Sequence, residues 1–489
     1  MTDICLFLSD QHSYLQQGYA GNTIVRTPNL DRIARSGVVF DNNYTSYPLC
    51  VPARMSLMSG QLSSKCGVMG NFSVLSSERA TFTHSLNSIG YETVLCGRMH
   101  FVGPDQRHGF SRRIAGDITP IFTNRPTEAF KKERGVHLNT PTGGPACISI
   151  IGAGDSPTLE FDRYVVETAL DYLKDSYEKP QFLCVGTYAP HHPYVAPKKL
   201  YDYYYEKLGE ESLDDVDLPL PQFYSSIFQD KDKDVVRAVR AAYYAMVEFT
   251  DSEVGRVYDA FQEYLKRTGH EGIFIYASDH GDHIGRRGLY GKNTFFEESA
   301  HTPMIFTGSG VAEGRRYCGA TSLMDLGPTL CELTGAPVAP DTDGVSFARQ
   351  VRGGEDDTDR MVISELGGTA DRKTGKVSYA QMVKWKNYKF VHYHGLDEDS
   401  VFDTAKDPEE GNNIISLMPE FAMKCREFLS SKCASYDEIR KNAEREAGNL
   451  AITMRCSFDS DERWHAPDCA RHYPEEMVSS RMKAPEVKW

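Results

Sequence analysis

Three short apolar runs, far apart in the chain, end in clusters of polar residues, and this pattern limits the possible folds most. The runs are Ile4 to Leu8, Phe182 to Thr187 and Ile273 to Ala277. Such runs, separated by longer helix-like stretches such as Val235 to Leu265, are typical of buried strands in an α/β domain with a largely parallel sheet. Open α/β sheets bind ligands at the carboxyl ends of their strands. We therefore expect the polar clusters to meet at one edge of the sheet.

A change in the sequence pattern near residue 356 indicates a second domain. Residues 379–395 alternate apolar and polar side chains over two short runs separated by Lys386 and its neighbour, which is typical of an antiparallel hairpin. A chain of 489 residues is also too long for one compact core. The sequence therefore predicts a catalytic domain over residues 1–355 and a smaller α+β domain with an antiparallel sheet over residues 356–489.

The sequence also predicts where one helix begins and ends. Asn29 to Ser36 is predicted to form a helix, and Gly37 directly after it is suited to a left-handed cap.

Charge and hydropathy exclude some functions. The formal net charge of -14 argues against a broad surface for nucleic acid, because such surfaces need Lys and Arg to neutralise phosphates. No apolar run reaches the length of a membrane span, and the first twelve residues, MTDICLFLSDQH, have no basic start or small-residue cleavage site. We expect a cytoplasmic protein that binds neither nucleic acid nor membrane.

The twelve cysteines do not form the pattern of a disulfide scaffold. They are spread irregularly over the chain and include no CxxC pair. We expect all of them except Cys50 to be mainly buried thiols that pack as small apolar residues.

Cys50 begins the most specific motif, CVPAR, which ends at Arg54. Taken alone, the motif also fits a buried cysteine before a helix with Pro52 in its first turn. It resembles the signature of sulfatases, in which the cysteine of CxPxR is oxidised to formylglycine by a maturation enzyme. The resemblance implies that Cys50 becomes the nucleophile. It also implies the alkaline-phosphatase-like fold, a large and mostly parallel mixed sheet flanked by helices.

Two strand ends carry the candidate metal ligands. In the family that the chain resembles, acidic residues after the first strand, and DN or DH after a later one, hold a divalent ion together with the modified cysteine. The matching residues here are Asp10, Gln11, Asp279 and His280, with Cys50. Hard oxygen ligands suit Ca²⁺, which we expect, or Mg²⁺ or Mn²⁺. Gln11 replaces the commoner Asp and lowers the negative charge of the site.

Four further residues are expected to act on the sulfate group. The string GRMH resembles the GKWH or GKMH element of sulfatases, with Arg98 in place of the sulfate-binding lysine and His100 as general base. Arg54 is expected to hold the nucleophile and the sulfate through its fork of donors. Asn71 matches a sulfate-contacting asparagine, although a turn residue after a glycine is the alternative.

Two residues are expected to protonate the departing alcohol. His191 lies in PHHP, which resembles the PHxP element of the family, and Lys292 lies in LYGKNTFFEES, which resembles its LxxKxxxxE element. The neighbouring His192 has no counterpart in the pattern, and we expect it to be structural.

The resemblance covers most of the chain and is nearest to the branch of choline sulfatases and phosphonate monoester hydrolases. Asp117 fits the choline sulfatases, but the stretch ITPIFTNRPTEAF after it lacks the tryptophans that cage a quaternary ammonium in those enzymes. The sequence therefore favours a sulfated sugar or a small alkyl or aryl sulfate as substrate. Specificity is expected in the loop from Pro120 to Ser156.

Three functions stay open on sequence alone. The first is hydrolysis of a sulfate monoester, the second is hydrolysis of a phosphonate monoester or phosphodiester on the same scaffold, and the third is binding of a sulfated ligand without cleavage. The expected partners are a small sulfated substrate and a formylglycine-generating or radical maturation enzyme. A homo-oligomer is also expected, with the tail Trp464 to Trp489 as a contact.

Overall fold

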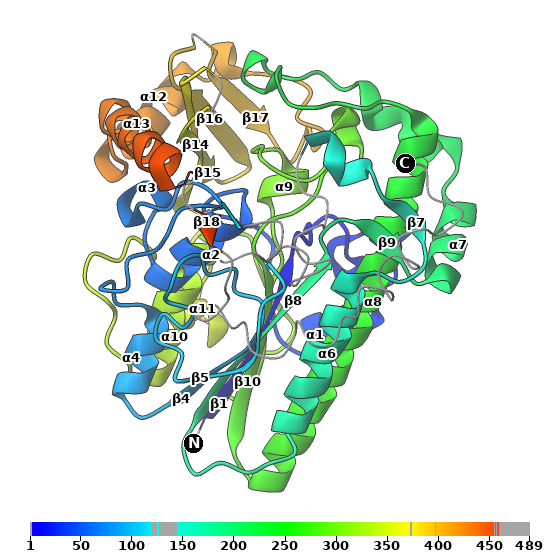
Figure 1. Ribbon diagram of the computed structural model, residues 1–489, viewed down its shortest axis with the longest axis vertical. Coiled ribbons are helices and arrows are strands. Elements are labelled where there is room, and N and C mark those ends of the chain that lie inside the picture. Colours follow the sequence, from blue (N-terminus) through cyan, green and yellow to red (C-terminus); the bar gives the residue numbers. More distant parts are fainter. Residues whose placement is uncertain are drawn as a thin grey trace.

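A computed structural model describes residues 2–119, 125–126, 144–371, 374–396, 398–453, 455 and 457–458. Its centre is an eight-stranded mixed sheet with helices on both faces (Figure 1). The five neighbours from β10 to β5 are parallel, whereas β11 runs antiparallel to both β10 and β2. In spatial order the strands are β12 (Arg315–Tyr317), β2 (Val38–Phe40), β11 (Met304–Gly308), β10 (Glu271–Ser278), β1 (Thr2–Asp10), β8 (Gln181–Pro190), β4 (Glu92–Gly97) and β5 (Arg112–Ala115).

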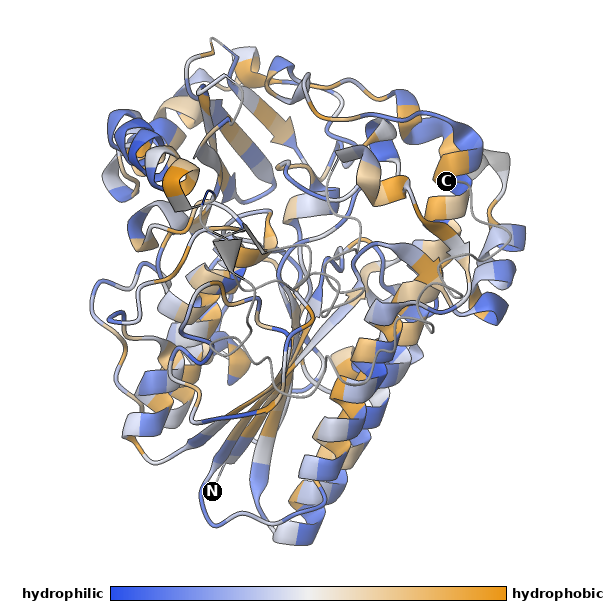
Figure 2. Cartoon of the chain, in the orientation of Figure 1, coloured by the Kyte–Doolittle hydropathy of each residue, from blue (hydrophilic) through white to orange (hydrophobic). Residues whose placement is uncertain are grey.

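The sheet is buried on both faces, which explains why its central strands are continuous apolar runs. Side chains at alternate positions of β1 enter two different cores. Ile4, Leu6 and Leu8 pack with α2 (Cys50–Ser59), α4 (Phe82–Ser88) and α10 (Leu326–Thr334), while Cys5 and Phe7 pack with α1 (Pro28–Arg35), α6 (Pro157–Tyr172) and α8 (Lys233–Thr268). Figure 2 shows the apolar character of the strands between the partly hydrophilic helices.

The predicted elements of the large sheet are confirmed. Ile4 to Leu8 lies in β1, Phe182 to Thr187 in β8 and Ile273 to Ala277 in β10. The periodic stretch Val235 to Leu265 lies within α8, a single helix of 36 residues. Asp232 caps the beginning of α8 by accepting from the backbone N–H groups of residues 234 and 235.

The predicted role of Gly37 is wrong. Helix α1 is present, but Ser36 is its C-cap residue, with φ of -90°, and Gly37 does not have the positive φ of a left-handed cap. Instead, a Cβ atom on Gly37 would lie 1.9 Å from the backbone oxygen of Phe306 on β11. Glycine is required here because two backbone segments approach each other closely.

The C-terminal part contains the predicted antiparallel sheet. Its four strands follow chain order, and the turn between β15 and β16 is at Lys386, with φ of 54°. One face packs against Tyr44, Tyr47, Phe295 and Phe296 of the large sheet's loops. The boundary at residue 355 stays a prediction. The elements are β14 (Met361–Ala370), β15 (Val377–Trp385), β16 (Tyr388–Tyr393), β17 (Ser400–Asp403), α12 (Pro419–Lys432) and α13 (Tyr436–Thr453).

Shorter elements lie outside these two sheets. The strands are β3 (Asn43–Tyr44), β6 (Arg125–Pro126), β7 (Ile151–Ala153), β9 (Tyr194–Ala196), β13 (Thr321–Ser322) and β18 (Ser457–Phe458). The α-helices are α3 (Ser63–Cys66), α7 (Lys198–Lys207), α9 (Glu297–Ala300) and α11 (Ala348–Val351). The 3₁₀ helices are η1 (Gly18–Ala20), η3 (Gly144–Ile148), η4 (Glu210–Asp217), η5 (Gln222–Tyr224), η6 (Arg286–Gly288), η7 (Leu323–Asp325) and η8 (Ile415–Leu417).

Three other expectations concern cysteines, membranes and loops. Ten cysteines are described, all as thiols; besides Cys50, seven are buried as expected, whereas Cys318 is exposed and Cys433 is partly exposed. Over the described residues, no helix is both long enough and apolar enough to cross a bilayer. Most of the predicted specificity loop and the whole tail from Trp464 lie outside the described residues.

Candidate active site

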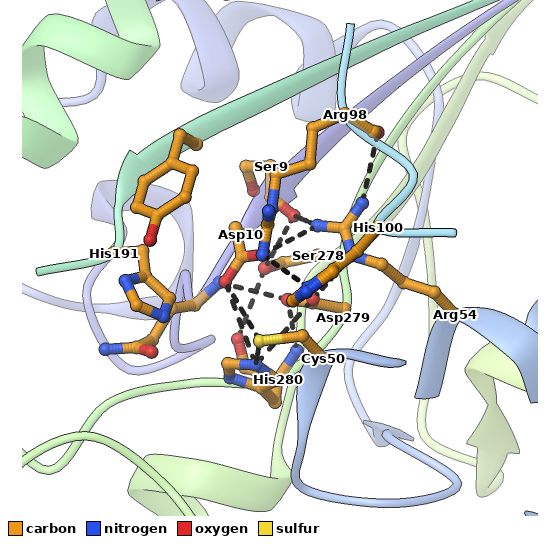
Figure 3. A network of polar contacts seen from close by, with 12 residues as sticks. Ser9, Asp10, Cys50, Arg54, Arg98, His100, His191, Ser278, Asp279 and His280 are labelled. Carbon is orange, nitrogen blue, oxygen red and sulfur yellow. Dashed lines mark hydrogen bonds and ion pairs between the residues drawn. The ribbon is translucent and has the colours of Figure 1, made fainter. Parts of the chain in front are cut away.

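The polar clusters predicted at the strand ends meet at one edge of the large sheet. Asp10 ends β1, and its neighbour Pro190 at the end of β8 is followed by His191. On the other side of β1, Ser9 is in register with Ser278, which precedes Asp279. Because parallel neighbours end at the same edge, residues that are some 270 positions apart lie together (Figure 3).

Four predicted metal ligands form one buried group. One ligand atom from each of Asp10, Cys50, Asp279 and His280 lies within 4.8 Å of all the others. The Sγ atom of Cys50, the first residue of α2, is 3.8 Å from Oδ1 of Asp10 and 3.2 Å from Nε2 of His280. None of the four side chains has more than 1% of its surface exposed. The group is protected from bulk water.

Two buried arginines bind the carboxylates of this group. Arg54 donates from Nε to Oδ2 of Asp279 at 2.7 Å and from Nη2 to Oδ2 of Asp10 at 3.1 Å. Arg98 donates from Nε to the same Oδ2 of Asp10 at 2.6 Å. Burial alone would raise the pKa of Asp10, but the positive charges, led by Arg98, hold that pKa well below its usual range. Asp10 is therefore an anion.

The fork of Arg54 is already occupied within the protein. Besides the two carboxylates, it donates to the backbone oxygens of Ser9 and Arg98 at 3.3 Å. Its contact with a substrate stays a prediction.

Lys292 joins three of the predicted residues. Its Nζ lies 3.1 Å from Sγ of Cys50, 2.6 Å from Oε1 of Gln11 and 2.6 Å from Nε2 of His191. Burial, with His192 and Lys292 nearby, lowers the pKa of His191 well below its usual value. His191 is therefore neutral and accepts a hydrogen bond from the Lys292 ammonium. An ammonium that is hydrogen-bonded to both Gln11 and His191 still has a proton that it can give to another group in the site.

His100 is held by Arg98 and Asp117. Its Nδ1 is 2.8 Å from Nη2 of Arg98, and its backbone N–H donates to Oδ2 of Asp117 at 2.8 Å. Burial and then the Arg98 charge lower the pKa of His100, so its ring is neutral, with Nδ1 accepting from Arg98 and the proton on Nε2. His100 has φ of 59°, and such strained non-glycine backbone is concentrated at functional sites.

Asp117 is a site residue whose role the sequence did not indicate. Burial favours the neutral acid, but Arg98 and His100 lower the pKa of Asp117 to about 2. In the sequence, Asp117 is only an acidic residue 17 positions after His100, and no pattern indicates that its side chain lies beside His100.

Asn71 contacts the beginning of α2. Its Oδ1 accepts from the backbone N–H of Val51 at 3.1 Å, and the residue also lines the central cavity. This places Asn71 beside Cys50, while its contact with sulfate stays a prediction.

Gln11 is oriented by a residue that the sequence analysis did not select. Its Nε2 donates to Oδ2 of Asp282, and its Oε1 accepts from Lys292. Asp282 also accepts from the Tyr194 hydroxyl at 2.8 Å. The signal was the second Asp of SDHGD, two positions after the predicted ligand His280. Gln11 has φ of 68°, which turns the chain sharply after β1.

A cavity of about 350 Å³ opens next to these residues. Its charged and polar lining includes residues from five separate segments, and the rest of its described wall is largely apolar or aromatic. Such a cavity accommodates a small organic group attached to an oxyanion. The polar residues include Cys50, Asn71, Arg98, His100, His191, His192 and Lys292, and the apolar and aromatic ones include Leu49, Phe72, Ile118, Tyr188, Ile227 and Phe228.

The fold and the site are those of a hydrolase, with carboxylates, imidazoles, arginines and a lysine around one cysteine side chain at the edge of an α/β sheet. Residues 2–336 match the family model described as Sulfatase, and residues 285–430 match that described as N-sulphoglucosamine sulphohydrolase, C-terminal. The chain belongs to the sulfatase family and is a sulfuric ester hydrolase.

Individual relatives agree with this assignment. The choline-sulfatase of Rhizobium meliloti (strain 1021) is 36% identical over 414 residues, which cover 80% of this chain and 78% of that protein. The arylsulfatase of Clostridium perfringens is 26% identical over 456 residues, which cover 85% and 90%. The phosphonate monoester hydrolase of Agrobacterium radiobacter superposes with a TM-score of 0.70 at 22% identity, covering 88% and 95% of the two chains. The expected alkaline-phosphatase-like fold and branch are confirmed.

Proposed function

We propose that this enzyme hydrolyses a sulfate monoester to an alcohol and inorganic sulfate, with a formylglycine made from Cys50 as nucleophile and a divalent metal ion beside it. One observation carries the proposal. The Sγ atom of Cys50 lies at the cavity wall within 3.8 Å of Asp10, His280 and Lys292, a carboxylate, an imidazole and an ammonium. Residue 50 also begins a helix of ten residues, whose first N–H groups favour negative charge.

Formylglycine suits this position because its hydrate has two hydroxyl groups on one carbon. One hydroxyl oxygen attacks the sulfur, and the bond from sulfur to the alcohol oxygen breaks. The other hydroxyl then loses its proton, the aldehyde forms again, and the bond from carbon to the sulfate oxygen breaks. Water adds to the aldehyde and restores the hydrate. A serine could make the first step, but it has no second hydroxyl for the exit of sulfate.

The residues around Cys50 fit a hard divalent cation. Arg54 and Arg98 both bind Oδ2 of Asp10, while Oδ1 faces Cys50 and His280. The ligands would be Asp10, Asp279, His280, the Oε1 of Gln11 and residue 50, and their oxygens favour Ca²⁺, with Mg²⁺ or Mn²⁺ as alternatives. When bound, such an ion lowers the pKa of a hydroxyl group on residue 50.

The remaining residues would bind the sulfate or transfer protons. Arg98 and Asn71 would hold the sulfate oxygens at the cavity wall. Lys292, with His191 as its hydrogen-bond partner at 2.6 Å, would give a proton to the oxygen of the leaving alcohol. His100 would take the proton of the second hydroxyl at Nδ1, once Arg98 turns its Nη2 from that nitrogen to the sulfate.

The alcohol part of the substrate is proposed more broadly. A sulfated sugar or a small alkyl or aryl sulfate fits a cavity of about 350 Å³ with an apolar wall. Relatives include a choline-sulfatase and an arylsulfatase, and a structural neighbour is a 2-O GAG sulfatase. Choline sulfate remains less favoured because residues 118–130 contain no tryptophan.

Two measurements test the proposal. The first is the mass of the peptide that contains Cys50, from protein matured in its native host, where conversion of the thiol to the aldehyde gives a defined loss of mass. The second is turnover of an aryl sulfate, a phosphonate monoester and a phosphodiester by the matured protein and by C50A. We expect the sulfate to be the best substrate, and C50A to be folded and inactive.

The alternatives have their own outcomes. Turnover of phosphorus esters alone would support the phosphonate monoester hydrolase. An unmodified Cys50 in the native host, combined with tight binding of a sulfated ligand, would support a non-catalytic binding protein. Full activity of C50A would refute the whole mechanism.

A further inference from the structure

Lys292 lies in a loop, although its ammonium contacts three residues of the site. The loop runs between η6 (Arg286–Gly288) and α9 (Glu297–Ala300), outside the helices and strands. A lysine side chain has a long flexible stem, so its ammonium stays in place only if the backbone that carries it is fixed. The contacts that fix this backbone therefore bear on the reaction.

One side of the loop is attached to the segment before Cys50. The backbone N–H of Asn293 donates to the oxygen of Pro48 at 3.1 Å, and Asn293 has φ of 74°. This contact sets the backbone next to Lys292 relative to the nucleophile position. It does not hold the residues that follow.

The other side is attached to the C-terminal sheet through Lys389, on β16. Lys389 is fully buried, and its Nζ lies 2.7 Å from the backbone oxygen of Phe295 and 2.5 Å from Oε1 of Glu297. It also lies 2.7 Å from Oε1 of Glu410, whose Oε2 accepts from the backbone N–H of Glu297 at 2.8 Å. We call Lys389, Glu410 and Glu297 the buried clamp.

Two of the three clamp side chains, Lys389 and Glu297, are held in their charged forms. Burial opposes the ammonium of Lys389, but Glu297 and Glu410 raise its pKa above the ordinary value. Burial likewise opposes the Glu297 carboxylate, but Lys389 and His301 hold its pKa well below the usual range. The Tyr44 hydroxyl adds a hydrogen bond to Glu297 at 2.9 Å.

A buried ion pair of this kind is a poor source of net stability. The cost of removing both charges from water offsets most of their attraction, and apolar residues of the same volume often stabilise as well or better. The contacts of Lys389 do, however, specify one position for the backbone of residues 295–297. Position is therefore the better explanation of the clamp.

We propose that Lys389 is a positioning residue for the reaction: from the C-terminal sheet it fixes residues 295–297 and thereby holds the Lys292 ammonium beside residue 50 and His191. This inference rests on the proposed function, in which Lys292 protonates the leaving alcohol. Loss of the clamp should therefore lower kcat most for substrates whose leaving alcohol is a poor leaving group and requires protonation.

The test compares two buried lysines of one hairpin. Lys384 and Lys389 are cross-strand neighbours on β15 and β16, but the Nζ of Lys384 donates to Thr404 at 2.6 Å, outside the loop. K389M removes the clamp, and K384M is the matched control. Each matured variant is assayed with 4-nitrophenyl sulfate, a good leaving group, and with phenyl sulfate, a poor one.

We expect kcat of K389M to fall about 100-fold for phenyl sulfate and less than about 10-fold for 4-nitrophenyl sulfate, the size of effect produced by a misplaced acid. K384M should change both by the same small factor. Equal losses on both substrates in K389M would overturn the inference.

A second variant separates position from stability. K389M removes the cation between Glu297 and Glu410, whereas K389M/E410Q removes one carboxyl with the lysine and should recover the unfolding midpoint in urea. Its defect on phenyl sulfate should persist. Recovery of activity together with stability would show that Lys389 is only structural. If the matured wild-type protein cleaves neither these aryl sulfates nor any alkyl or sugar sulfate, the proposed function itself fails.

Discussion

The Gln11 amide is oriented by Asp282, and exchanging their acid and amide groups tests this orientation. Gln11 donates from Nε2 to Oδ2 of Asp282. Oδ1 of Asp282 accepts from the backbone N–H groups of Ile284 and Gly291, both at 2.9 Å. An asparagine at position 282 would keep its oxygen toward these N–H groups. Its NH₂ group would then face the NH₂ group of Gln11, and two donors would oppose each other.

The expected changes in the free energy of unfolding follow from these contacts. D282N loses a hydrogen bond to a charged acceptor, which costs about 1.5 to 3 kcal/mol. Q11D places a second carboxylate about 4 Å from Asp282, and like charges at that distance repel by about 4 kcal/mol at an effective dielectric constant near 20. Q11D/D282N restores one carboxylate facing one amide. Its free energy of unfolding should return to within about 1 kcal/mol of wild type, so the two changes couple by at least about 2 kcal/mol.

Urea unfolding of the four proteins in EDTA at pH 7 measures this coupling. EDTA is included because a divalent ion would screen the new carboxylate and hide the repulsion. The predicted contact is refuted if the two single changes add in the double variant. That result would mean that the Gln11 side chain does not face Asp282.

Three further predictions concern the ion, pH and the fold. Ca²⁺ at 100 times its dissociation constant should raise the free energy of unfolding by about 2.7 kcal/mol, and D10N should remove this response in the same urea titration; an unchanged response would contradict the ligand set. Burial lowers the pKa of Lys384 to about 8, so the unfolded chain binds more protons between pH 8 and pH 10.5. The stability of wild type relative to K384M should therefore rise across that window, by up to about 3 kcal/mol, and a flat difference would refute the shift. G37A should destabilise by about 1 to 3 kcal/mol because its Cβ meets the Phe306 oxygen, whereas G448A, with open space in α13, should not; equal effects in thermal unfolding would refute the close approach.

The central sheet could be predicted because its signal is local. The runs at Ile4, Phe182 and Ile273 are apolar at consecutive positions, which is what burial on both faces requires. The meeting of Asp10 with Asp279 then follows from a general rule about parallel strands. The motif at Cys50 added the third segment through its resemblance to a family. The prediction that these strand ends meet did not require the order or register of the strands.

Contacts between side chains of distant segments could not be predicted in the same way. Asp282 was passed over because nothing in SDHGD indicates that Gln11 will face it. Lys389 had a usable signal, since it shares a strand face with Val391 and Tyr393, where a lysine is unusual. Its partner Glu410 could not be inferred, because it lies in a loop with no periodic pattern.

The charges around residue 50 suggest why arginines expected on the substrate are bound to carboxylates. Asp10, Asp117 and Asp279 contact Arg54 or Arg98, and Lys292 adds a third cation, so these three carboxylates and three cations balance one another. With the proposed divalent ion, two negative charges restore neutrality. An ionised hydroxyl on residue 50 and a singly charged ester supply them. A phosphate monoester with two charges would exceed this balance, which favours a singly charged ester such as a sulfate ester at this site.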